Sequence, residues 1–368
     1  LRYPAGVFLP EKKLRRVRPY RRDLGGADFI IMLQFGHFVF MRAFMAVITL
    51  LTVSFIVFTL MEFVPSNCAE RYLAFKNTQG GQISIADIEA EERRMGLDKP
   101  YAVRWGTWVG NVFFKGDFGE SCILRVGINQ LLGQKFWLSL GICLTSLLFA
   151  YAIAIPVGIL SASSNNKSLN NALRFFSYLG LAMPNFLLAL MIMLFSTVVF
   201  GDSLTGLFSK EFRDAAWSYD RVIDFLSRAW LPIFILGWSA TAFALQTVRA
   251  LMSDENGKLY VTAAKARGLS GRQLLWRYPA RHALGPIINS LGFDLNRVFN
   301  ELPIVALILV LTEAGALLID ALARSNDQQL AGAIIFMLTA SIITLNFLTD
   351  IALALIDPRV WRSITGGG

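Results

Sequence analysis

The sequence predicts an all-α integral membrane protein. Of its 368 residues 55% are hydrophobic, and the mean hydropathy of +0.51 exceeds that of ordinary soluble domains. The apolar residues gather in six windows of roughly 20 residues, the length that a helix needs to cross a bilayer. The fifth window is the least regular, because it contains three charged residues, whereas each of the others contains at most one. The windows cover residues 43–64, 136–160, 172–200, 229–251, 284–311 and 330–356.

The distribution of basic residues predicts the orientation. Residues 1–42 form a basic arm, the segment after the fourth window is basic, and the chain ends with Arg359 and Arg362 before a short tail, 363–368. Because basic residues accumulate on the cytoplasmic side of a membrane, both ends are predicted to be cytoplasmic. An even number of crossings agrees with this.

The loops divide by the same rule. Acidic and basic residues balance in 65–135 and 201–229, which are predicted to be extracytoplasmic, whereas the basic segment 252–283 is predicted to be cytoplasmic. Residues 43–362 then make up one six-helix domain. In the arm, the apolar stretch 29–40 suits a helix lying in the interface, and a disordered tail is an equal alternative for the first 25 residues.

The net charge of +9 does not indicate a nucleic-acid partner. The basic residues cluster at the predicted membrane edges, where anionic lipid head groups explain them more simply. Membrane lipid is therefore the predicted partner of the arm.

The first long loop contains a helix and several turns. Residues 85–95 have helical periodicity and an acidic face, which favours a solvated helix with Ile85, Ile88 and Met95 turned inward. Two Gly- and Asp-rich turns follow, at 96–100 and 116–121. Cys68 and Cys122 are able to pair outside the cell, but three scattered cysteines do not make a disulfide framework, and unpaired thiols are favoured.

The third window is predicted to bend. Pro184 lies in its middle, and a proline inside a helix removes one backbone hydrogen bond and clashes with the preceding turn.

The segment 252–283 predicts a helix, a sharp turn and a second helix. Good helix formers run from Leu259 to Arg267, and Gly268 can end a helix in the left-handed conformation. Ser270 and Gln273 have the spacing of a capping box, so the second helix is predicted to begin there. An ordered basic element between two apolar windows suggests a docking surface, with a plain solvated loop as the alternative.

The order Thr262-Ala263-Ala264, Gly268 and Pro286 resembles the signature loop of binding-protein-dependent ABC importer permeases, although Thr262 stands where many members have Glu. The turns at 96–100 and 116–121 and the motif at 182–186 are similar to the dipeptide/oligopeptide branch, and the likeness runs from about residue 41 to 362. It implies the type I ABC importer permease fold with a cytoplasmic coupling helix. The implied coupling residues are Tyr260, Thr262, Ala263, Ala264, Lys265, Arg267, Gly268 and Leu269.

The resemblance also implies the partners. They are a second homologous permease, two ATP-binding subunits that hold ATP and Mg²⁺, and an extracytoplasmic solute-binding protein in a bacterial inner membrane. The implied function is import of peptides or a similar polar solute, including oligosaccharides. Relatives share a motif that runs from the fifth window into the residues directly after it, and this chain departs from that motif at residues 300–301, 306–309 and 312–313.

The fifth window carries a charged stripe. Asp294, Arg297 and Glu301 recur on one helical face, with Asn300 beside them. Charges in the hydrocarbon zone are costly unless paired or hydrated, so the stripe is predicted either to line a translocation pathway or to join a partner helix. Arg297 is expected to pair with Asp294 or Glu301.

Enzyme classes find no support in the sequence. The two histidines, His37 and His282, are far apart, and no Gly-x-x-x-x-Gly-Lys-Ser/Thr phosphate loop is present, so no cofactor or metal is predicted in this chain. The alternative function is an ATP-independent ion-coupled transporter or channel that uses the Asp294/Arg297/Glu301 stripe. A scaffold that recruits an ATPase is a third possibility.

Overall fold

The computed structural model describes most of the chain. The described residues are 24–63, 67–78, 84–164, 166–201, 204–212, 215–311, 314–325 and 327–356. The first 23 residues of the predicted basic arm, the tail from residue 357, and Thr312 with Glu313 lie outside them. Within the described residues the regular elements are helical, and one isolated bridge joins Glu120 and Gly127.

The helices follow the chain in this order: α1 Leu24–Phe63, α2 Cys68–Thr78, α3 Ile85–Met95, α4 Tyr101–Gly110, η1 Asn111–Lys115, α5 Ile128–Ser163, α6 Lys167–Ala182, α7 Asn185–Phe200, α8 Tyr219–Asn256, α9 Leu259–Ala266, α10 Gly271–Arg277, α11 Pro279–Ile308, α12 Ala314–Ile319, η2 Asp320–Arg324 and α13 Gln328–Ile356.

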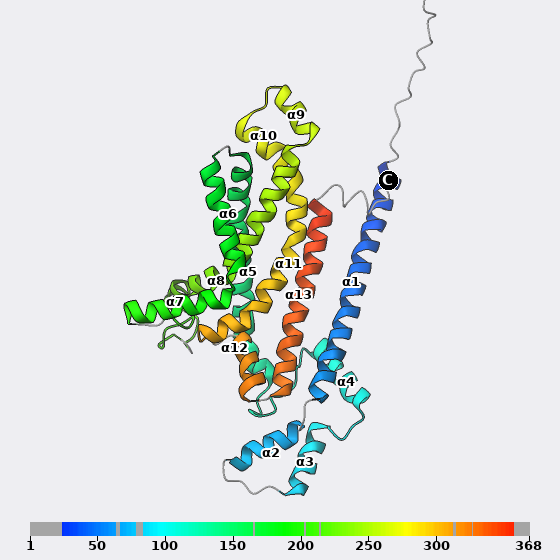
Figure 1. Cartoon of the computed structure of the whole chain (residues 1–368). Helices are drawn as coiled ribbons and strands as arrows, with labels where there is room; N and C mark the ends of the chain where they lie inside the picture. The colour runs from blue at the N-terminus through cyan, green and yellow to red at the C-terminus, as the bar shows by residue number, and fades with distance from the viewer. Residues whose placement is uncertain are drawn as a thin grey trace, which may run out of the picture.

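The centre of the fold is a bundle of α5, α8 and α11, with α13 alongside (Figure 1). Small buried residues allow α5 and α8 to approach closely: Ala154 and Gly158 on α5, Ala240 and Ala244 on α8. A Cβ atom built on Gly158 would lie 2.6 Å from Cγ1 of Val248. Since lipid removes most of the hydrophobic drive between membrane helices, such close backbone packing is a main source of their association.

Four helices are long and apolar enough to cross a membrane by length and composition: residues 33–63 of α1, α5, α8 and residues 328–355 of α13. The pair α6 and α7 adds a fifth span if the two are counted together. The fifth predicted window corresponds to α11, whose polar residues keep it outside this group. Each of the six predicted windows therefore overlaps a helix or a helix pair, and the count of six crossings stays a prediction.

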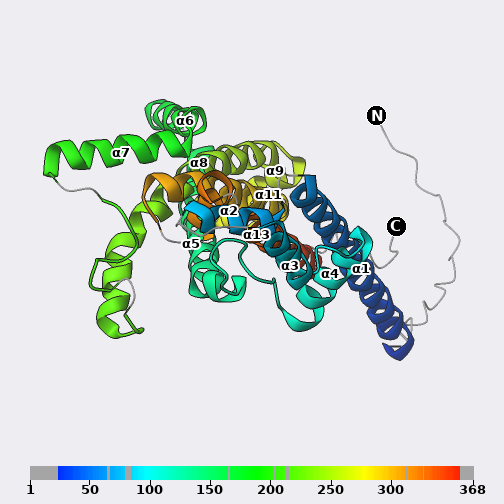
Figure 2. The same ribbon diagram turned by 90° about the horizontal axis from the view of Figure 1, so that it is seen from below.

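The predicted bend at Pro184 is confirmed. Helix α6 ends at Ala182, α7 begins at Asn185, and their axes differ by 96°. Figure 2, seen from below, shows α7 extending away from the bundle instead of continuing α6. The third window is thus a broken helix pair.

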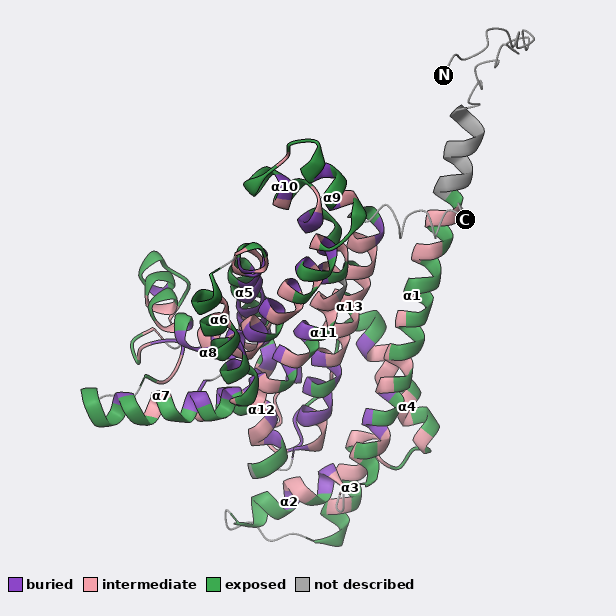
Figure 3. Ribbon diagram, turned by 45° about the horizontal axis from the view of Figure 1, so that its top comes forward, coloured by how far each residue is buried: buried purple, intermediate pink, exposed green. Residues whose placement is uncertain are grey.

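Short helices occupy the two ends of the bundle. Helices α9 and α10 lie at one end and α2, α3 and α4 at the other, as expected for loops on opposite sides of a membrane (Figure 1). Helix α1 lies at the edge and is mostly exposed in Figure 3, and the Arg42–Asp350 ion pair at 2.8 Å joins it to α13. Helix α1 also runs without a break across the predicted arm boundary at residue 42.

Two expectations for the first long loop were wrong. Cys68 and Cys122 form a disulfide, with their Cα atoms 5.3 Å apart, because the packing of α2 against the loop after η1 brings together residues that are 54 positions apart. Helix α3 spans the predicted residues, but Ile85 is 78% exposed, since it lies at the first position of a helix with no buried residue.

Candidate functional site

The pair α9 and α10 forms the predicted helix, turn and helix. Helix α9 ends at Ala266, and Gly268 takes a left-handed φ of +86°. Its amide donates to the carbonyl of Lys265 at 2.9 Å, and that of Leu269 donates to Ala264 at 3.2 Å, which satisfies the carbonyls at the helix end. The sharp turn at Gly268 is therefore confirmed.

The predicted capping box at the start of α10 was wrong. The side chain of Ser270 makes no capping hydrogen bond. Gly271, the first residue of α10, has a left-handed φ of +60°, so the chain does not enter the helix with the backbone geometry that a capping box requires.

The α9–α10 element, residues 259–278, has a small apolar core of its own. Val261 and Ala264 of α9 pack against Leu274 of α10, with Tyr260, Leu269 and Tyr278 around them. Of the predicted coupling residues, Ala264 is buried in this core, Tyr260 and Leu269 are half-buried, and the others face outward. The exposed ones are Thr262, Ala263, Lys265, Arg267 and Gly268.

Large apolar side chains interrupt the basic outer surface of this element. Leu259 is 87% exposed and Trp276 47% exposed, beside the exposed cations of Arg272 and Arg277. Exposed apolar anchors surrounded by polar residues are typical of protein docking surfaces.

The element is attached to the bundle through a residue that the sequence analysis missed. Glu255, in the last turn of α8, is only 7% exposed. Its carboxylate accepts hydrogen bonds from the hydroxyl of Tyr260 and, at 2.5 Å, from Nζ of Lys258. The ring of Tyr260 also lies edge-on to His282 of α11, with 4.9 Å between centroids. The sequence did contain a signal for this contact. Glu255 is an acidic residue at the end of an apolar helix, five positions before Tyr260.

The charged stripe on α11 points into the bundle at Asp294. This residue is 2% exposed, its carboxylate accepts a 2.5 Å hydrogen bond from the hydroxyl of Tyr151 on α5, and that hydroxyl also lies 2.9 Å from Oγ of Ser290. Arg297 Nη2 lies 3.4 Å from the other oxygen. Arg297 therefore pairs with Asp294, one of the two predicted partners.

Arg297 keeps unused hydrogen-bonding capacity. Its guanidinium lies 5.0 Å from the ring centroid of Phe243 on α8, and its side chain is 30% exposed. Among the residues that the structure describes, Nε and Nη2 are buried without a hydrogen-bond partner. Buried donors of this kind are normally satisfied, but here Nη2 has only the 3.4 Å ion pair with Asp294, and Nε has no hydrogen-bond acceptor among the described residues.

Glu301 joins the other end of the stripe to the helix break. Nδ2 of Asn185, the first residue of α7, donates to the Glu301 carboxylate and also lies 3.2 Å from Oγ of Ser239 on α8. Asn300 is exposed and bonds to Asn296 at 3.2 Å, so it lies apart from these contacts. The stripe thus makes contacts with three other helices, and Tyr151, Asn185 and Ser239 were not found from the sequence.

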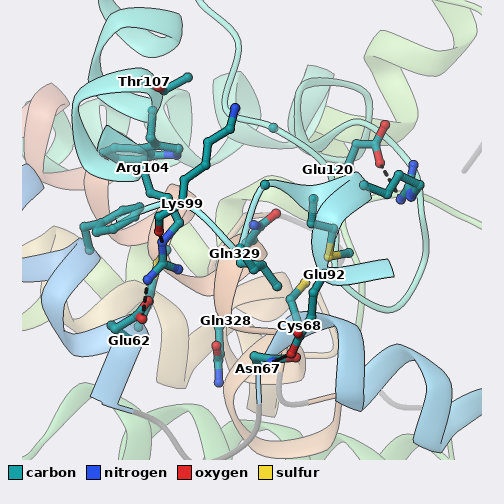
Figure 4. Close-up of a pocket in the computed structure, with 18 of the residues that line it drawn as sticks. Glu62, Asn67, Cys68, Glu92, Lys99, Arg104, Thr107, Glu120, Gln328 and Gln329 are labelled. Carbon is teal, nitrogen blue, oxygen red and sulfur yellow. Dashed lines mark hydrogen bonds and ion pairs between the residues drawn. The ribbon is translucent and has the colours of Figure 1, made fainter. Parts of the chain in front are cut away.

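A polar pocket lies at the opposite end of the bundle, in the head formed by α2, α3, α4 and the loop after η1. Its volume is about 680 Å³, and both acids and bases line it (Figure 4). Across it, Arg104 pairs with Glu62, and Asn67 donates to Glu92 at 2.5 Å. Together with the disulfide, these contacts connect the segments of the head to one another and to the end of α1.

One acid in the head makes its stability depend on pH. Glu91 is 17% exposed and lies 2.5 Å from Nη2 of Arg125 and 2.8 Å from Nε of Arg94. Burial raises the pKa of this carboxyl, but the hydrogen bonds and charges of both arginines outweigh burial and hold it below 4.5. A lowered pKa stabilises the fold above the ordinary value, and this contribution is lost as the pH falls below 4.5.

We therefore expect α3 to lose protection at acid pH. Amide hydrogen exchange, corrected for the intrinsic rate, should stay low in residues 85–95 at pH values above the ordinary pKa of 4.5 and should rise as the pH falls below it, because a carboxylate with a lowered pKa protonates only there. Glu91→Gln should flatten this response. Glu89→Gln is the control, since the side chain of Glu89 is 63% exposed and its ion pair with Arg93 is long at 3.7 Å. An equal response in wild type and Glu91→Gln would contradict the assignment.

The described residues contain no group of three His, Cys, Asp or Glu side chains placed to hold a metal ion.

Comparisons with known proteins identify the family. Residues 154–362 match the family described as binding-protein-dependent transport system inner membrane component. Residues 32–137 match a second family model, which describes the N-terminal part of membrane components of binding-protein-dependent transport systems. The oligopeptide transport system permease protein AppB of Bacillus subtilis is 28% identical over 328 residues, which cover 88% of this chain and 98% of AppB.

Two further proteins are similar. The putrescine export system permease protein SapB of Escherichia coli is 26% identical over 274 residues, 69% of this chain and 84% of SapB. A solved inward-facing structure of the MetNI methionine ABC transporter has a TM-score of 0.48 and 18% identity, and covers 64% of this chain and 96% of that chain. This chain belongs to the binding-protein-dependent transport system inner membrane component family and is a permease subunit of an ATP-driven importer, whose ATPase and solute-binding functions lie on partner subunits.

Proposed function

We propose that this permease imports peptides and forms half of a translocation pathway with a second, homologous permease. Two ATP-binding subunits dock on the α9–α10 element, and a solute-binding protein delivers the solute at the head. Both termini face the cytoplasm, and the basic arm contacts anionic lipid. The observation that carries the proposal is the α9–α10 element, an ordered basic surface with apolar anchors at one end of the bundle.

The coupling step is mechanical. When the ATP-binding subunits close, they displace the exposed surface of the α9–α10 element, which Thr262, Ala263, Lys265 and Arg267 share. Because this element is attached to both α8 and α11, the displacement reaches α11, which carries Arg297, and α8, whose Phe243 lies against it. Packed helices then move between two arrangements, which open the pathway to either side.

The polar stripe provides the contact with the solute. Asp294, Asn300 and Glu301 accompany Arg297, whose free donors suit a carboxylate such as the one at the end of a peptide. The name of the oligopeptide permease relative supports a peptide solute. A polar solute with another acceptor, such as an oligosaccharide, would use the same donors.

Arg297→Gln should reduce the uptake of a labelled oligopeptide by proteoliposomes about tenfold or more, since a hydrogen bond to a charged group contributes about 1.5–3 kcal/mol. Arg228→Gln is the matched control, because this arginine is 38% exposed and pairs with Asp224 on its own helix. Unchanged uptake in Arg297→Gln would remove the stripe from the pathway. Loss of the second permease from the purified complex would instead assign Arg297 to the subunit interface.

The subunit composition tests the whole proposal. The chain should be purified in mild detergent, the proteins recovered with it identified by mass spectrometry, and the ATPase activity of the eluate measured. A second permease together with ATP-binding subunits is the expected result. A homo-oligomer without ATPase activity would contradict the proposal and favour ion coupling through the stripe.

A further inference from the structure

Glu255 is buried although its neighbour in the chain, Asp254, is exposed. The two acids Asp254 and Glu255 end α8 side by side, yet the side chain of Asp254 is 73% exposed and that of Glu255 only 10% exposed. Burying a carboxylate is costly unless it is paired and hydrogen-bonded. Here both of its oxygens are used.

The two partners of Glu255 belong to the next helix. Lys258, the residue before α9, reaches Oε1 at 2.5 Å, and the hydroxyl of Tyr260, inside α9, donates to Oε2. Charge-assisted hydrogen bonds of this kind are short and directional. They fix the first turn of α9 relative to the last turn of α8.

Without these bonds the connection between the two helices would rest on the backbone alone, where the amides of Gly257 and Lys258 donate to the carbonyls of Asp254 and Glu255, each at 3.2 Å. The chain joins α8 to α9 through only Gly257 and Lys258, and glycine imposes little conformational restriction. The apolar core of the α9–α10 element lies within that element and does not include α8. A displacement of α9 would then change the backbone torsion angles at Gly257 and leave α8 in place.

Tyr260 extends the same connection to a third helix. Its hydroxyl bonds to Glu255, while its ring lies 4.9 Å from that of His282, in the first turn of α11. One side chain of α9 thus contacts the ends of both bundle helices. The hydroxyl makes the contact with α8 and the ring makes the contact with α11.

We propose that Glu255 is the positioning residue that fastens the α9–α10 element to α8, so that α8 moves with α9 when the ATP-binding subunits bind nucleotide. This inference rests on the proposed function. Glu255 contacts neither solute nor ATP; it acts through Lys258 and Tyr260. Removing its carboxylate should leave α9 able to move while α8 stays behind.

Distances between spin labels test this in the complete complex reconstituted with its ATP-binding subunits. Labels on Ala266 of α9 and Ser253 of α8 are each measured against Ser168 of α6, and all three sites are exposed. The native cysteines do not interfere, since Cys143 is buried and the other two are bonded. Distances are compared without nucleotide and after trapping with ATP and vanadate.

In the wild type both distances should change on trapping. In Glu255→Ala the α9 distance should still change and the α8 change should be lost. Asp254→Ala is the control: it removes only the 3.4 Å contact of an exposed carboxylate with Lys258, leaves both bonds of Glu255 in place, and should behave like the wild type. Tyr260→Phe, which removes only the hydroxyl and keeps the ring beside His282, should show a partial loss and serves if Glu255→Ala does not assemble.

The outcomes separate the two proposals. If both labels move together in Glu255→Ala, the role of Glu255 is wrong while docking at the α9–α10 element stands. If the Ala266 label does not respond to nucleotide even in the wild type, coupling through the α9–α10 element is itself wrong. A merely stabilising role for Glu255 would lower the melting temperature and leave the two movements linked.

Discussion

Gly268→Val is expected to abolish ATP-dependent uptake while the chain stays inserted in the membrane. At φ +86° the backbone is left-handed, and this conformation costs an L-residue about 1–2 kcal/mol, with β-branched side chains least tolerated. A Cβ at this position would meet nothing within 4 Å, so the damage comes from the backbone and not from a collision. The turn between α9 and α10 would rearrange and displace the docking surface.

Proteoliposomes with the complete transporter provide the measurement, as labelled oligopeptide taken up per ATP hydrolysed. Gly201→Val is a matched control, because Gly201 ends α7 with φ +70° and also has open space around it. Gly201→Val introduces the same kind of backbone strain, but at the end of α7 and not in the α9–α10 element. Unchanged uptake in Gly268→Val would overturn the role of this turn.

Gly158→Leu should give the largest loss of stability. A Cβ at Gly158 would lie 2.6 Å and 2.8 Å from Cγ1 and Cβ of Val248, and the second atom cannot move without the backbone of α8. Overpacking a tight core usually costs about 1–3 kcal/mol. The cost here should lie at or above the top of this range, because the substitution separates the two helices that pack most extensively in the bundle.

Thermal unfolding in mild detergent would measure the effect, with intrinsic tryptophan fluorescence as the signal. Gly141→Leu on the same helix is the control, since Gly141 is exposed and has nothing within 4 Å of its Cβ position. The two variants carry the same change of residue in α5. Equal melting temperatures for both would show that α5 and α8 can separate without penalty.

Local features could be read from the sequence because they depend on residues close together in the chain. The bend at Pro184 and the end of α9 at Gly268 follow from backbone restrictions at single positions. The residues of α3 follow from helical periodicity. These signals need no knowledge of the tertiary fold.

Contacts between distant helices could not be predicted in the same way. Asp294 meets Tyr151 across 143 positions, and Glu301 meets Asn185 across 116. Helical spacing showed that Asp294, Arg297 and Glu301 lie on one face of the helix. On such a face both acids are within reach of Arg297, so spacing does not decide which of them it pairs with. Only the packing of α5 and α8 decides that Arg297 pairs with Asp294.

The disulfide between Cys68 and Cys122 also constrains how the protein is made. Its sulfurs flank α2, α3 and α4, so the bond can close only after this whole stretch has been synthesised and has reached an oxidising compartment. Until then the head holds together through noncovalent contacts such as that of Glu91 with Arg125. In the orientation that we propose, with the head outside the cytosol, biogenesis of the permease requires thiol oxidation there in addition to membrane insertion.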